Sequence, residues 1–133
     1  MTKKNDVFLG GALAALLLSF SAPALAAGAM DEIATAQTHA ELAGTATDPN
    51  YTTMHMHHTL NCLVGPGGNG FDAKMLNPCA QSGNGAIPDM ADPGKKAKLE
   101  ALAQLSRDAI AAKDWAVAKK DAAGVAAQLK AFK

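Results

Sequence analysis

Residues 48–66 read DPNYTTMHMHHTLNCLVGP, a stretch that predicts one helix with a defined start and end. Asp48 is a typical helix-capping residue, and Pro49 suits the first helical position, where its missing N–H costs nothing. Gly65 followed by proline is a typical helix end. We therefore expect a helix over residues 49–64.

The segments on either side predict further helices. Asp92 followed by Pro93 repeats the start signal, and after it apolar residues recur at intervals of three and four. Asp31 and Glu32 are expected in the first turn of a helix, where negative charge is favourable. The expected helices are residues 31–46, 49–64, 94–112 and 114–132. They predict an all-α fold, an up-down four-helix bundle made of two αα-hairpins, 31–64 and 95–132.

A glycine- and proline-rich insert, residues 65–94, separates the two hairpins. It contains seven glycines and four prolines, so no regular element is expected to run far through it. Cys62 and Cys79 are the two cysteines of the chain, and we expect a disulfide between them that ties down the insert. Closing a loop of this length is worth ~3 kcal/mol in the chain-entropy model. The alternative is a thiol pair used for metal.

The first 26 residues have the pattern of a secretory signal peptide. Lys3 and Lys4 precede an apolar run over residues 7–20, and Ala24 and Ala26 form a small-x-small end. The run is shorter than the ~20 residues of a membrane-spanning helix, although an uncleaved anchor is the alternative. Cleavage after Ala26 predicts a single periplasmic helical domain, residues 27–133, with no membrane attachment.

Charge and motifs exclude several classes of protein. The chain has 12 basic and 12 acidic side chains, whereas a nucleic-acid-binding protein needs a basic surface to neutralise phosphates. The sequence has no HExxH motif, no serine–histidine–aspartate pattern and no suggestive pair of carboxylates. It has no CxxC or CxxCH motif either, which argues against thioredoxin-type chemistry and covalent haem. We therefore do not expect an enzyme.

Three of the four histidines lie within four positions and predict a metal site. His55 and His58 are three residues apart on one helical face, which also carries Met54. If the first hairpin turns near residue 47, His39 lies opposite His55. Imidazole suits copper, zinc and nickel, and a methionine sulfur favours Cu(I). The expected ligands are therefore His39, His55, His58 and Met54, holding copper or zinc for storage, delivery or sensing.

Two alternatives remain open from the sequence. A b-type haem could be held by His39 with His55 or His58, or by His39 with Met54. A structural or interaction protein without any ligand would instead use the histidines as polar core residues. Association as a homodimer or with a periplasmic metalloprotein is compatible with either kind of site.

The export signal, the histidines and the alanine- and lysine-rich segments 31–64 and 95–132 resemble the small metal-binding protein family of the periplasm. This resemblance implies a short four-helix bundle that binds copper, nickel or zinc. His39, His55, His57 and His58 would stand for that family's many histidines. The histidines of this chain do not recur through all four helices, and its disulfide-tied insert departs from the family pattern.

Overall fold

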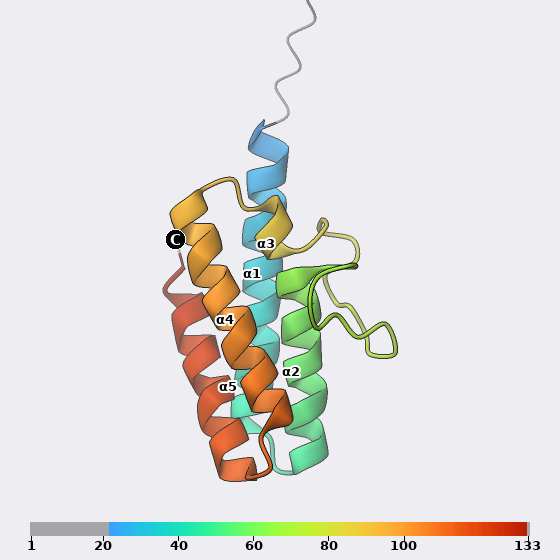
Figure 1. The fold of residues 1–133 in the computed structure, drawn as a ribbon, viewed down its shortest axis with the longest axis vertical. Coiled ribbons are helices and arrows are strands. Elements are labelled where there is room, and N and C mark those ends of the chain that lie inside the picture. Colours follow the sequence, from blue (N-terminus) through green and yellow to red (C-terminus); the bar gives the residue numbers. More distant parts are fainter. Residues whose placement is uncertain (1–21, 133) are drawn as a thin grey trace, which may run out of the picture.

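The computed structural model describes residues 22–132, and within this range the chain is helical and contains no strand. The helices are α1 (Ala22–Thr45), α2 (Pro49–Val64), α3 (Ala86–Asp89), α4 (Pro93–Ala111) and α5 (Trp115–Lys130). Helices α1 and α4 each pack against both α2 and α5, so the four long helices enclose one core (Figure 1). The predicted all-α class is confirmed.

The capping residues read from the sequence bound α2 and α4 as expected. The side chain of Asp48 accepts a hydrogen bond from the backbone N–H of Tyr51 at 2.9 Å, and Asp92 accepts one from Lys95 at 2.7 Å. Gly65 ends α2 with a φ of 67°, a conformation that favours glycine, and its N–H donates to the carbonyl of Asn61. The predicted bounds of α2, residues 49–64, are confirmed.

The predicted start of the first helix at residue 31 is wrong, because α1 is already helical from Ala22. The added turns are rich in alanine, the strongest helix former, and Pro23 lies in the first turn, where proline is tolerated. Asp31 and Glu32 therefore lie inside the helix rather than in its first turn. Glu32 is fully buried, at 0% exposed, so its role differs from the one that the sequence predicted.

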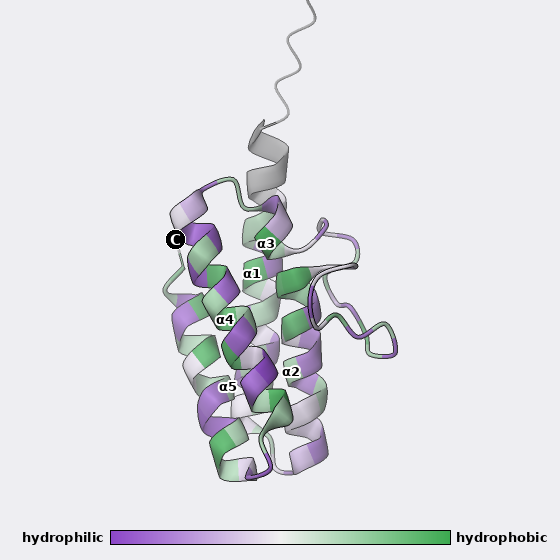
Figure 2. Ribbon diagram, in the orientation of Figure 1, coloured by the Kyte–Doolittle hydropathy of each residue, from purple (hydrophilic) through white to green (hydrophobic). Residues whose placement is uncertain are grey.

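Small residues let α1 approach its neighbours closely. Ala36, Ala40 and Ala43 are fully buried along one face of α1. Across the core lie larger side chains of α2, α4 and α5, among them Met56, Leu60, Leu63, Leu99 and Leu129. Figure 2 shows that each long helix carries both hydrophobic and hydrophilic residues, and that α2 is most hydrophobic at the end next to the insert.

Buried threonines of α2 set its position along α1. Thr59 Oγ1 lies 3.3 Å from the carbonyl oxygen of Ala36, and Thr52 Oγ1 lies 3.2 Å from that of Ala43. Thr52 also accepts a hydrogen bond from the indole nitrogen of Trp115 at 2.9 Å, which ties α5 to the same point. These side chains connect three helices through buried polar contacts.

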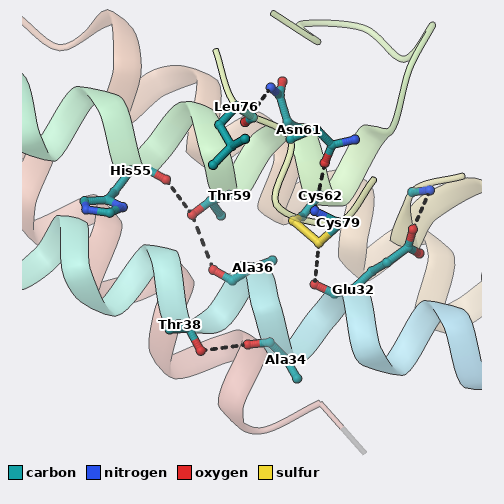
Figure 3. Close-up of a disulfide and its surroundings, with 12 residues drawn as sticks. Glu32, Ala34, Ala36, Thr38, His55, Thr59, Asn61, Cys62, Leu76 and Cys79 are labelled. Carbon is teal, nitrogen blue, oxygen red and sulfur yellow. Dashed lines mark hydrogen bonds between the residues drawn. A yellow bond between two sulfur atoms is a disulfide. The ribbon is translucent and has the colours of Figure 1, made fainter. Parts of the chain in front are cut away.

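The insert is fastened to the end of α2 by covalent and polar contacts. Cys62 and Cys79 form the predicted disulfide, which closes a loop of sequence separation 17. Asn61 is fully buried and binds the insert backbone, because its side chain accepts from the N–H of Asp72 and donates to carbonyls, including that of Leu76 (Figure 3). One short helix, α3, lies within the stretch that was expected to be irregular.

The predicted signal peptide falls mostly outside the described residues. Residues 1–21 are not described, and the predicted cleavage point after Ala26 lies in the first turns of α1. In the described part of the chain, every helix is too short or too polar to cross a membrane.

Reduction of the disulfide should lower the free energy of unfolding by about 3 kcal/mol, because the reduced unfolded chain regains the entropy of the open loop. Urea denaturation with and without a reductant measures this change. A C62A/C79A double variant is the control, since reductant should not affect it. Equal denaturation midpoints for the reduced and oxidised wild-type protein would contradict the prediction.

Candidate metal site

Three histidines from two helices converge on one point. His39 extends from α1, and His55 and His58 extend from successive turns of α2. One nitrogen of each ring can be chosen so that all three lie within 4.8 Å of one another. The ring centroids are 5.0 to 5.4 Å apart. The prediction that His39 lies opposite His55 is therefore confirmed, and we call these three residues the histidine cluster.

The distance between His39 and His55 is close to the one that two ligands of a metal ion require. His39 Nδ1 and His55 Nδ1 are 2.9 Å apart, so one of them must donate a proton to the other when no metal is present. Two imidazole nitrogens bound to one tetrahedral zinc ion lie about 3.3 Å apart, given Zn–N bonds of ~2.0–2.1 Å. Small side-chain rotations would therefore convert the hydrogen-bonded pair into a pair of ligands.

The backbone and a neighbouring ring hold the histidine cluster in place. His55 is 5% exposed and His58 is 7% exposed, whereas His39 is partly buried. The rings of His55 and Tyr51 make a T-shaped contact, with centroids 4.5 Å apart. Thr59, the next residue along α2 from His58, contacts the carbonyl oxygens of both His55 and Ala36 (Figure 3).

Burial keeps the histidine cluster uncharged at neutral pH. It is the main cause that lowers the pKa of His39 from 6.5 to about 4, with smaller contributions from His58 and His55. Burial also lowers the pKa of His55, and that of His58, where nearby His55 and His57 add to the effect. Neutral imidazole is the form that binds metal ions, so the folded chain presents three ligands ready to coordinate.

Two buried nitrogens of the histidine cluster lack a hydrogen-bond partner among the described residues. They are His55 Nε2 and His58 Nδ1. Leaving a buried polar atom unpaired costs about 1–3 kcal/mol, so such atoms are uncommon in a stable core. A group bound among the three rings would provide a partner for some of these unpaired nitrogens. The donor set consists of neutral nitrogens, which suits copper, zinc or nickel.

The remaining residues of the predicted site have different surroundings. Met54 is partly buried on α2 immediately before His55, and its role as a ligand stays a prediction. His57 lies outside the histidine cluster, with its Nδ1 3.8 Å from a carboxylate oxygen of Asp72 in the insert. The two adjacent histidines therefore have different surroundings: His58 belongs to the histidine cluster, and His57 lies near the insert.

The geometry disfavours a haem held by His39 with His55 or His58, whereas ligation by His39 with Met54 stays a prediction. Two axial ligands must lie on opposite faces of the haem, with the iron and the macrocycle between them. The 2.9 Å between His39 Nδ1 and His55 Nδ1 leaves no space for a porphyrin between these rings. The His58 ring makes T-shaped contacts with the rings of His39 and His55, which leave no space for a porphyrin between those rings either.

Sequence reasoning missed the buried polar groups on either side of the histidine cluster. Glu32 precedes His39 by seven residues, a spacing that places both on one face of a helix and could have indicated its burial. No comparable signal links Trp115 to Thr52, because their contact joins helices that are distant in the sequence.

Comparison with known proteins identifies no matching family model, no similar curated protein and no similar solved structure. The site is therefore interpreted from its own geometry and chemistry.

The lowered pKa of His39 predicts that acid destabilises the metal-free protein. The unfolded chain binds this proton near pH 6.5 and the folded chain only near pH 4, so the contribution to stability is lost as the pH falls through that range. His39→Gln should therefore gain stability relative to the wild type on acidification, by up to about 1.4 kcal/mol per pH unit. Urea denaturation at several pH values measures this difference.

His57→Gln serves as the control for that experiment, because His57 lies outside the histidine cluster. A difference between His39→Gln and the wild type that stays constant from pH 7 to about pH 4 would contradict the prediction.

Proposed function

We propose that this chain is a small exported protein that binds a copper or zinc ion through His39, His55 and His58, for storage, delivery or sensing of the metal. In this proposal the four long helices form an up-down four-helix bundle, and the first hairpin supplies every ligand. It takes residues 1–26 as the signal that sends the protein to the periplasm. Nickel, which also binds imidazole, is the third candidate ion.

One observation carries the proposal: three histidines from two helices offer nitrogens within 4.8 Å of one another. Side chains that serve only as polar filler would each be expected to pair with a backbone group or a carboxylate. The rings of the histidine cluster instead face one another, and two of their buried nitrogens are unpaired. The hydrogen bond between His39 and His55 leaves these two nitrogens without a partner, and a bound cation would use nitrogens of the histidine cluster as ligands.

Replacing a ligand should weaken metal binding. His39→Ala, His55→Ala and His58→Ala should each lower the affinity for Cu or Zn at least ~10-fold, or about 1.4 kcal/mol, because one of three nitrogen ligands is lost. Competition against a chromophoric chelator measures the affinity, and His57→Ala is the matched control from the same helix. Unchanged affinity in all three variants, or no binding by the wild type, would refute the proposed function.

A second substitution separates the two metals. If the Met54 sulfur completes the site, Met54→Leu should weaken Cu(I) binding and leave Zn(II) affinity unchanged, since thioether sulfur favours Cu(I). Leucine preserves the volume and apolarity of the side chain, so the fold is a poor explanation for any difference. Equal affinities of the wild type and Met54→Leu for Cu(I) would remove Met54 from the ligand set.

A further inference from the structure

A second group of buried polar side chains lies where the insert returns to α1. Glu32 is fully buried, and its Oε1 accepts a hydrogen bond of 2.7 Å from the backbone N–H of Gly85 (Figure 3). Its other oxygen, Oε2, is buried and has no hydrogen-bond partner among the described residues. An ionised carboxylate with a buried, unpaired oxygen is costly, so this group requires an explanation.

Asp89 of α3 is the second carboxylate at this point. It is 6% exposed, and its Oδ2 accepts from the backbone N–H of Asn84 at 2.8 Å while its Oδ1 accepts from the Asn84 side chain at 3.0 Å. Both oxygens of Asp89 therefore have donors, as an ionised carboxylate prefers. The two carboxyl groups thus have unequal surroundings, one with a complete set of donors and one without.

Gly83 shows how close the two carboxyl groups are. A side-chain carbon added at Gly83 would collide with Asp89 Oδ2 and would lie 3.0 Å from Glu32 Oε1. Only the backbone of the insert fits against this pair, so residue 83 has no room for a side chain of opposite charge.

Among the described residues, no basic side chain compensates the pair. The charges that act on Glu32 are those of Asp89 and of Asp31 on its own helix, and both are negative. Of the helices packed against α1, α2 carries only histidines as titratable cations, and the charged residues of α5 are not buried: Lys119, Lys120, Asp121 and Lys130. The other charged residues of the insert are Asp72, Lys74 and Asp92, and none of them is among the charges that act on Glu32.

We propose that Glu32 and Asp89 hold one proton between them, carried by Glu32, and that this acid–carboxylate pair fastens residues 83–89 to α1 in a pH-dependent manner. Protonated Glu32 keeps its acceptor bond from Gly85 and carries no charge, which removes the cost of burying an unpaired anionic oxygen at Oε2. Loss of the proton places two negative charges side by side in the core. Residues 83–89 then loosen from α1, while the Cys62–Cys79 disulfide keeps the rest of the insert attached.

The direction of the pH effect follows from the surroundings of Glu32. Burial raises its pKa from 4.5 to about 7, helped by Asp89 and Asp31 and opposed by the Gly85 N–H. Because the folded chain holds this proton more tightly than the unfolded chain, the stabilisation is complete below about pH 4.5 and is lost as the pH rises to about 7. The histidine cluster acts in the opposite direction, so the test must isolate Glu32.

Glu32→Gln in the intact chain isolates this contribution. Glutamine is uncharged at every pH and can still accept from the Gly85 N–H, so it imitates the protonated acid. The ratio of the folding constants of Glu32→Gln and wild type should rise by up to ~10-fold per pH unit between about pH 5 and 7, then level off. Urea denaturation in EDTA measures the ratio, and Glu41→Gln, at an exposed glutamate of α1, is the control.

A ratio that does not change with pH would overturn the proposal. So would a pH-independent difference between Glu32→Gln and wild type that appears only when CaCl₂ replaces EDTA, because it would identify a cation site instead of a shared proton.

A second measurement applies even where Glu32→Gln does not fold. The amide resonance of Gly85 should titrate near neutral pH in the wild type, since this N–H donates to Glu32. In Asp89→Asn the midpoint should move to lower pH, because a negative neighbour has been removed. A Gly85 amide that does not titrate, or an equal midpoint in both proteins, would refute the pairing of Glu32 with Asp89.

Discussion

The position of α2 along α1 is the constraint on which the rest of this structure depends. Thr59 and Thr52 contact the carbonyl oxygens of Ala36 and Ala43, and these contacts fix the register at two points along the helix pair. His39 and His55 lie between those two points. A shift of one residue along α1 would rotate His39 by about 100°, away from the α2 histidines. The buried threonines therefore position the histidine cluster without belonging to it.

Much of this register could be predicted from the sequence, because it depends on local signals. Asp48, Pro49 and Gly65 fix both ends of α2, and a turn near residue 47 then places His39 opposite His55. The start of α1 was not predicted, because the alanine-rich residues before Asp31 have the pattern of a signal-peptide end. The acidic pair at residues 31 and 32 resembles a first turn, yet Glu32 is buried by a segment more than fifty residues further along the chain.

The contacts of the insert show why long-range partners escape sequence reasoning. The disulfide could be predicted, since a chain with two cysteines allows a single pairing. No comparable sequence feature predicts the contacts of Asn61, although its side chain binds the insert backbone through both its oxygen and its nitrogen. Its role depends on where a glycine-rich loop returns, which local propensity does not determine. The bounds of helices follow from nearby residues, whereas the anchoring of loops follows from the assembled surface.

Helix α1 carries a partly buried histidine and a fully buried glutamate whose pKa values are shifted in opposite directions. Burial keeps His39 neutral by lowering its pKa to about 4, and it keeps Glu32 neutral by raising its pKa to about 7. Acidification between these values therefore weakens the fold at His39 and strengthens it at Glu32, so the two effects partly cancel. A metal bound by the histidine cluster would compete with protons for His39 and leave Glu32 unaffected. Metal binding would therefore remove this partial cancellation, and the stability of the metal-bound protein would fall more steeply with acidification than that of the metal-free chain.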